Sequence, residues 1–125
     1  MTWAGDDPAV LAAADAAARA RAQREVERPL LLEAGAGTGK TSVLVSRVVA
    51  WCVGPGWERA VAALAGGVEP ADGERVAARV LDGVVAITFT EAAAAEMEER
   101  IARALHALAR ADAPLPIGLD ADALP

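Results

Sequence analysis

The sequence predicts an α/β fold, in which a parallel β-sheet is flanked by helices. Two short apolar runs, 30–32 and 84–87, have the unbroken hydrophobicity expected of strands that are buried on both faces of a parallel sheet. A helical pattern follows each run, and a glycine-rich turn joins the first run to its helix. Alternating strands and helices are typical of α/β proteins, so these observations together predict the fold class.

The first helix is expected to begin at Asp7 and Pro8 and to extend to about Glu27. Asp7 can cap free backbone amides, and Pro8 at the first helical position has no amide to leave unpaired. The stretch is mostly alanine, which favours a helix but leaves a thin apolar face, so we expect a peripheral helix. Periodicity and the glycine and proline positions predict further helices at 39–53, 57–65, 73–81 and 91–109.

The segment 91–109 is the most amphipathic part of the chain. Its apolar side chains recur at helical spacing and share one face: Met97, Ile101, Leu105 and Leu108. The opposite face carries two acid–base pairs at four-residue spacing, each worth ~0.2–0.5 kcal/mol: Glu96 with Arg100, and Glu99 with Arg103. We expect the apolar face of this helix to pack on the rest of the domain.

The chain has 125 residues, which allows one domain at most. We divide it into an N-terminal helical segment (1–28), a central domain (29–109) with a helical insert at 57–83, and a proline-rich tail (110–125). Cys52 is the only cysteine, which excludes an intramolecular disulfide and fits a reducing compartment. No apolar stretch approaches the roughly 20 residues that a bilayer requires, and no export signal is recognisable. We therefore expect a cytoplasmic protein that does not contact a membrane.

Residues 34–41 have the pattern of a phosphate-binding loop, placed between the first predicted strand and the helix after it. Alanine replaces the first glycine of the usual pattern, and the segment reads Ala34, Gly35, Ala36, Gly37, Thr38, Gly39, Lys40, Thr41. The three glycines allow backbone amides to turn inward around a phosphate, and the following helix directs its N-terminal dipole at the same anion. We expect this loop to bind a nucleoside triphosphate.

Lys40 and Thr41 are the two residues of the loop that we expect to serve catalysis. Lys40 supplies a compact positive charge for the β and γ phosphates, and Thr41 can give its hydroxyl to Mg²⁺. Lys40 is the only lysine of a chain that otherwise uses arginine, which suggests a place where a flexible point charge is needed. The alternative interpretation is a glycine-rich turn in which Lys40 is only solvated.

A second motif follows the second apolar run and reads ITFTEAAAAEMEERI over 87–101. Together with LEAGAGTGKT over 32–41, it resembles motifs I and Ia of the UvrD/RecB-like superfamily 1 helicases, nearer the RecB and AddA exonuclease branch. Glu91 and Ala92 stand where the UvrD pattern has Asn-Lys, which suits the RecB-like branch. The resemblance covers roughly 15–109 and implies the RecA-like sheet of a P-loop NTPase, here as an incomplete motor domain.

The resemblance implies an ATP-driven translocase with ATP and Mg²⁺ as cofactors and single-stranded DNA as a partner, acting in DNA repair or recombination. It places Thr88, Phe89 and Thr90 against the DNA. The two hydroxyls can donate to phosphate, and Phe89 can stack on a base for ~1–3 kcal/mol. In the alternative interpretation Phe89 belongs to the core, Thr90 is only a helix cap, and Glu96 is only an exposed helix residue.

The sequence lacks a recognisable acidic strand for Mg²⁺ and water, and a recognisable arginine for the γ-phosphate, both of which a working motor needs. We therefore expect a fragment of a longer enzyme or a truncated gene product, with further helicase or nuclease domains or subunits as partners. Two other hypotheses stay open: a nucleotide-binding module without turnover, and another P-loop enzyme such as a small kinase.

Two further polar residues lie outside the motifs. The family often has an adenine-reading glutamine upstream of the loop, but Ala16 stands at the matching position, so we expect Gln23 to be a solvated helix residue. His106 has no partners at metal-ligand spacing, and we assign it no role.

Overall fold

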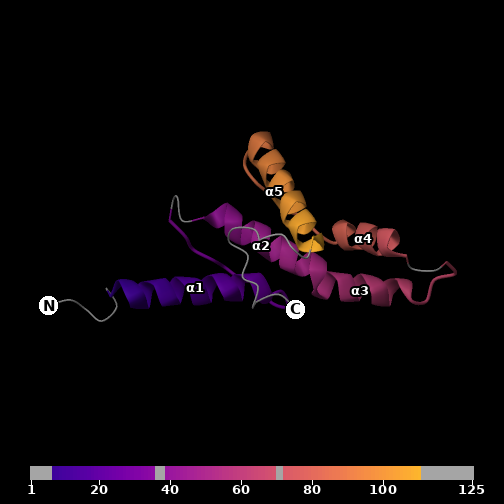
Figure 1. Cartoon of the computed structure of the whole chain (residues 1–125), viewed down its shortest axis with the longest axis horizontal. Coiled ribbons are helices and arrows are strands. Elements are labelled where there is room, and N and C mark those ends of the chain that lie inside the picture. Colours follow the sequence, from indigo (N-terminus) through magenta and orange to yellow (C-terminus); the bar gives the residue numbers. More distant parts are fainter. Residues whose placement is uncertain (1–6, 36–38, 70–71, 111–125) are drawn as a thin grey trace.

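The computed structural model describes residues 7–35, 39–69 and 72–110, and in these ranges the chain is helical (Figure 1). The helices are α1 (Pro8–Arg24), α2 (Lys40–Val53), α3 (Pro55–Leu64), α4 (Gly73–Asp82) and α5 (Glu91–Ala109). Helix α2 is central: α1, α3 and α5 all pack against it, and α4 packs on α3. In Figure 1, α1 lies below α2, α5 rises above it, and α3 continues from its C-terminal end.

The predicted parallel sheet is wrong for the described residues, because none of them forms a strand. The two apolar runs are extended but unpaired, and their side chains are open to solvent: Leu31 is 85% exposed, Val85 84% and Ile87 86%. A strand of a parallel sheet gains its stability from neighbouring strands and from helices on both faces. The described residues offer no strands beside these two runs, so the apolar pattern alone does not produce a sheet.

The helix predicted after Asp7 is confirmed, although α1 ends at Arg24, before the predicted end at Glu27. The Asp7 carboxylate accepts a hydrogen bond from the amide of Ala9 at 2.9 Å, and Pro8 occupies the first turn. The exposed side chains along most of α1 agree with a peripheral helix. The propensity of the alanines therefore forms this helix, while its contacts are confined to one end.

Arg47 of α2 anchors the C-terminal end of α1. Its Nη1 donates to the backbone carbonyl of Ala22 at 2.6 Å and to that of Glu25 at 2.5 Å. The last carbonyls of a helix have no partner within it, and a cation there also interacts favourably with the helix dipole. This anchored end buries Gln23, which is only 2% exposed, so the expectation that Gln23 is solvated is wrong.

The core consists of two clusters, both of which include residues of α2. The first joins α2 to α5 through four buried residues: Val45, Val49, Met97 and Ala104. The second joins α2 to α3 and α4, also through four: Cys52, Ala60, Val76 and Val80. The predicted apolar face of the last helix is confirmed, because Met97 is buried and its companions Ile101, Leu105 and Leu108 pack against the first cluster.

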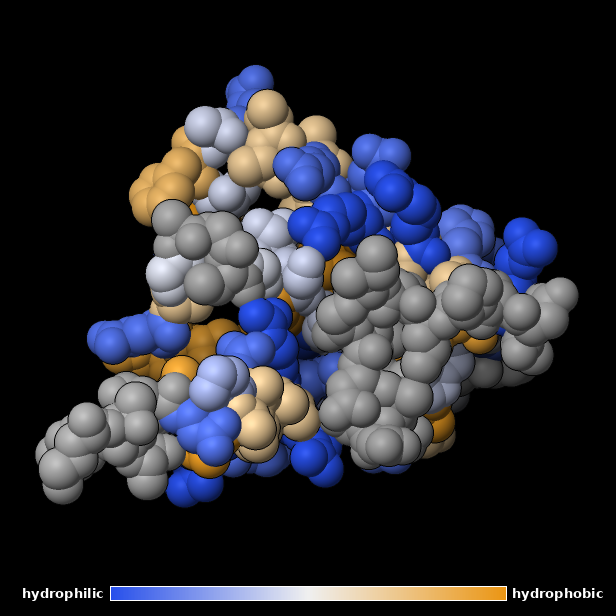
Figure 2. Space-filling model, turned by 60° about the vertical axis from the view of Figure 1, so that its left-hand side comes forward, coloured by the Kyte–Doolittle hydropathy of each residue, from blue (hydrophilic) through white to orange (hydrophobic). Residues whose placement is uncertain are grey.

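The insert at 57–83 forms the two predicted helices, α3 and α4, which lie against each other. Asp72 caps α4 by accepting a hydrogen bond from the amide of Arg75 at 2.9 Å. Apolar side chains also reach the surface, and Figure 2 shows them as orange areas among the hydrophilic ones. None of the helices in the described residues is long and apolar enough to cross a membrane.

Candidate functional site

The phosphate-binding motif lies at the start of α2, and its described residues are Ala34, Gly35 and 39–41. Ala36, Gly37 and Thr38 lie outside the described residues. Gly39 precedes the helix with φ of 84°, a left-handed conformation that glycine adopts at little cost. As the N-cap residue it offers no side-chain hydrogen bond to the first amides of α2. These amides and the positive end of the helix dipole are therefore not neutralised by a capping side chain.

Lys40 is the first residue of α2, and its side chain is exposed. It lines two neighbouring hollows of about 260 and 270 Å³, and the smaller of them also includes Gly35 of the loop. Thr41 follows in the first turn and is half-buried. The structure thus places the two expected catalytic residues beside each other at the end of the helix where an anion is favoured.

Arg19 is a second cation at this site, whereas the sequence pattern indicates it only as the helix partner of Asp15. That pair is present, with Arg19 Nε 2.8 Å from the Asp15 carboxylate. The Arg19 side chain also reaches the loop: a Cβ atom built on Gly39 would lie 3.3 Å from Arg19 Nη1. Both Arg19 and Asp15 line the smaller hollow with Lys40. Only the packing of α1 on α2 creates this contact, so local sequence patterns could not reveal it.

The predicted DNA-facing segment, Thr88 to Thr90, leads into α5. Phe89 is fully exposed, so the alternative that placed it in the core is wrong. Thr88 is half-buried, and Thr90 caps α5 by accepting a hydrogen bond from the amide of Ala93 at 3.1 Å. Glu96 is exposed one turn further along, 3.9 Å from Arg100. Contact with DNA by this segment stays a prediction.

A side-chain hydrogen bond joins the two motif-bearing helices. Arg100 of α5 donates from Nη2 to the hydroxyl oxygen of Ser42 at 2.6 Å, and Ser42 lies in the first turn of α2 after Lys40 and Thr41. The sequence spacing indicates only the pair of Arg100 with Glu96. The structure therefore adds a direct connection between the start of the phosphate-loop helix and the helix that follows the second motif.

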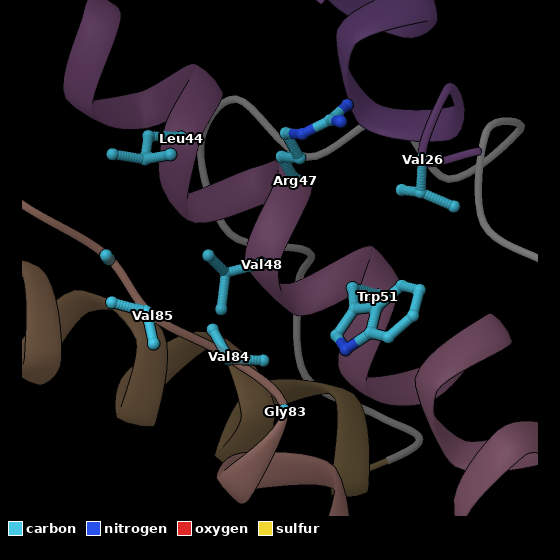
Figure 3. Close-up of a pocket in the computed structure, with 9 residues that line it drawn as sticks. Val26, Leu44, Arg47, Val48, Trp51, Gly83, Val84 and Val85 are labelled. Carbon is cyan, nitrogen blue, oxygen red and sulfur yellow. The ribbon is translucent and has the colours of Figure 1, made fainter. Parts of the chain in front are cut away.

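A third hollow, of about 240 Å³, lies under the middle of α2 (Figure 3). Val26 lies on one side of it, and Val84 and Val85 lie on the other, with Trp51 and Val48 of α2 between them. This hollow is the space between the two apolar runs that the sequence predicted to be strands. No three or more His, Cys, Asp or Glu residues in the described ranges are placed to hold a metal ion.

Comparison with known proteins gives one family. The UvrD/REP helicase N-terminal domain matches residues 15–116. Among curated proteins, the chain is similar to the ATP-dependent helicase/nuclease subunit (AddA) of Desulforudis audaxviator (strain MP104C), with 40% identity over 80 residues, or 64% of this chain and 5% of the relative. No solved structure matches the chain.

Two further relatives carry the same name. The protein of Clostridium botulinum (strain Hall / ATCC 3502 / NCTC 13319 / Type A) is 41% identical over 76 residues, which is 61% of this chain and 4% of the relative. That of Geobacillus thermodenitrificans (strain NG80-2) is 38% identical over 79 residues, or 63% and 5%. The chain thus spans about one twentieth of the length of these relatives. The resemblance drawn from the two motifs is confirmed, and the chain belongs to the UvrD/REP helicase N-terminal domain family.

Proposed function

We propose that this chain is the ATP-binding part of a cytoplasmic DNA helicase or ATP-dependent exonuclease of the AddA helicase/nuclease kind. In that role it couples ATP hydrolysis to movement along single-stranded DNA during repair or recombination. The observation that carries the proposal is the start of α2, where a left-handed Gly39 without a capping side chain precedes an exposed Lys40. Membership of the UvrD/REP family and the printed names of the relatives support it.

The residues at this end of α2 fit Mg·ATP by their chemistry. The loop amides and the first amides of α2 donate to phosphate oxygens, and Lys40 adds a positive charge at the β and γ phosphates. Thr41 gives its hydroxyl to Mg²⁺. A side chain at Gly39 would be strained at this φ and would crowd Arg19, so the conformation of the loop depends on this glycine. Arg19, which lies beside Gly39, adds a second cation to the site.

The segment before α5 supplies the contact with single-stranded DNA in this proposal. Phe89 is exposed without a packing role, as a base-stacking side chain must be. The oxygen of Thr90 is occupied as the cap of α5, but its hydroxyl hydrogen can still be donated to a phosphate. The net charge of −6 favours a local contact of this kind over binding along a basic surface.

The sequence offers no recognisable acidic strand and no recognisable arginine for the γ-phosphate. We therefore propose that residues 1–125 bind nucleotide and DNA, and that turnover requires residues outside this sequence. This assigns binding to the chain itself, which can be measured directly. It also predicts that the 125-residue chain releases little or no phosphate from ATP.

The test measures binding of a fluorescent ATP analogue with Mg²⁺, and separately of a labelled oligothymidylate, to the whole chain. Lys40→Ala should weaken nucleotide binding about tenfold or more, because a hydrogen bond to a charged group contributes about 1.5–3 kcal/mol. Phe89→Ala should weaken DNA binding by about 5- to 150-fold, which corresponds to the stacking of one base.

Arg103→Met serves as the control for both ligands. Arg103 pairs with Glu99 at 2.8 Å on the exposed face of α5, away from both motifs. Its substitution should leave both dissociation constants unchanged. Nucleotide binding that is as strong in Lys40→Ala as in the unchanged chain would refute the nucleotide assignment, and unchanged oligonucleotide binding in Phe89→Ala would refute the DNA assignment.

A further inference from the structure

The hydrogen bond between Arg100 and Ser42 connects the two sites of the proposed function. Arg100 Nη2 lies 2.6 Å from Ser42 Oγ, and the two residues are 58 positions apart in the sequence. The Arg100 side chain is 30% exposed and Ser42 is half-buried, so water competes less for this bond than for the other ion pairs of α5. A charged donor makes such a bond stronger than one between neutral groups.

Ser42 is held close to the phosphate loop by its own surroundings. Its Cβ lies 3.9 Å from the position that a Cβ on Gly39 would take, and its carbonyl accepts a hydrogen bond from Ser46 Oγ at 2.7 Å. The first turn of α2 thus carries Lys40, Thr41 and the acceptor for Arg100 on three consecutive positions. A change in this turn when a triphosphate binds is felt directly by Arg100.

Helix α5 carries this contact to the other motif. Thr90, the N-cap of α5, precedes Arg100 by ten positions, which corresponds to about 15 Å along a helix. The buried residues Val45, Val49 and Met97 hold α5 against α2, but apolar contacts have little directionality and permit small shifts. The guanidinium group of Arg100, with its fixed planar geometry, sets the position of α5 along α2.

We infer that Arg100, acting through Ser42, is the positioning residue that couples occupation of the phosphate loop to the affinity of the Thr88–Thr90 segment for single-stranded DNA. This inference rests on the proposed function, because it assigns a connection between the two sites that the proposal contains. Coupling of two sites is reciprocal: if nucleotide changes the affinity for DNA by some factor, DNA changes the affinity for nucleotide by the same factor.

The experiment measures that factor in the whole chain. The dissociation constant of a fluorescent, non-hydrolysable ATP analogue with Mg²⁺ is determined with and without saturating oligothymidylate, and the reciprocal titration is made with labelled oligothymidylate. The unchanged chain should show a factor of about 5–150 in both directions. Arg100→Met keeps the apolar stem of the side chain, and Ser42→Ala removes the acceptor. Each should bring the factor to about one while leaving the affinity for either ligand alone unchanged.

Two comparisons separate coupling from a loss of structure. The double variant Ser42→Ala/Arg100→Met should lose no more coupling than either single variant, because both remove the same bond. Arg103→Met, on the same helix but in the exposed pair with Glu99, should keep the full factor. If Arg100→Met lowers the helix content, Ser42→Ala, which removes a single hydroxyl, provides the same test in an otherwise unchanged chain.

The outcomes distinguish this inference from the proposed function. Binding of both ligands with full coupling in Arg100→Met and Ser42→Ala overturns the inference and leaves the proposed function standing. Binding of both ligands by the unchanged chain without any coupling overturns the inference as well. Failure of the unchanged chain to bind nucleotide refutes the proposed function, and the inference with it.

Discussion

Gly56 lies in the first turn of α3, and its lack of a side chain is needed there. A Cβ atom at this position would lie 2.6 Å from Trp51 Nε1 and 2.7 Å from the Trp51 carbonyl oxygen. Carbon atoms do not normally approach other heavy atoms so closely, and the carbonyl belongs to the backbone of α2, which cannot swing aside. Gly56→Ala must therefore shift α3 relative to α2 or displace the indole.

The magnitude follows from two opposing effects. Overpacking of this kind costs about 1–3 kcal/mol, whereas replacing glycine by alanine in a helix gains roughly 0.5–1 kcal/mol. The net loss in the free energy of unfolding should be about 1–2 kcal/mol. For a chain of this size, each kcal/mol corresponds to a fall in Tm of about 4–8 °C. The loss is a large share of the stability of a small domain.

Thermal and urea unfolding, followed by circular dichroism at the helix band, measure this effect. Gly73→Ala is the matched control, because Gly73 also lies in the first turn of its helix, but a Cβ there meets nothing within 4 Å. This substitution should raise the free energy of unfolding by about 0.4–1 kcal/mol. If Gly56→Ala were as stable as the unchanged chain, the close packing of α3 on Trp51 would be refuted.

Three further predictions concern single side chains. Arg47→Met should lower the free energy of unfolding by about 1–3 kcal/mol and speed amide exchange at the end of α1, because the carbonyls of Ala22 and Glu25 lose their donor; unchanged exchange there would contradict the anchoring role. Asp72→Ala removes the cap of α4 and should cost about 0.5–2 kcal/mol in urea unfolding, a loss that Asp72→Asn should largely avoid. Burial raises the pKa of the Cys52 thiol above its ordinary value of 9.0, so the stability that the neutral thiol contributes is present below pH 9.0 and is lost as the pH rises through the folded-state pKa; urea unfolding at a series of alkaline pH values should show a decline that Cys52→Ala lacks, and equal declines in both chains would count against it.

The sequence predicts the helices well because the signals that start and end them are local. Asp7 and Thr90 cap α1 and α5 within three residues, and glycines mark the boundaries of α2. The apolar face of α5 is equally a matter of spacing along one helix. Such features depend on neighbours in the sequence, so the pattern determines them.

The errors concern contacts between distant segments. The runs around Leu31 and Val85 have the composition of buried strands, but a strand exists only with partners, and composition does not state whether partners are present. Gln23 is polar and lies on an alanine-rich helix, yet the packing of α1 on α2 buries it. Arg19 reaches Gly39 for the same reason. The candidate site was therefore predicted where one continuous motif forms it, and missed where a second helix contributes.

The account depends above all on the segment 34–41 holding a triphosphate with the help of Lys40. Hydrogen–deuterium exchange of the whole chain, with and without a saturating non-hydrolysable ATP analogue and Mg²⁺, tests this at the amides themselves. We predict that nucleotide slows exchange in residues 34–41 and in the first turn of α2, and that this protection is absent in Lys40→Ala. Exchange that is unaffected by nucleotide, or protection that is equal in Lys40→Ala, would contradict the account.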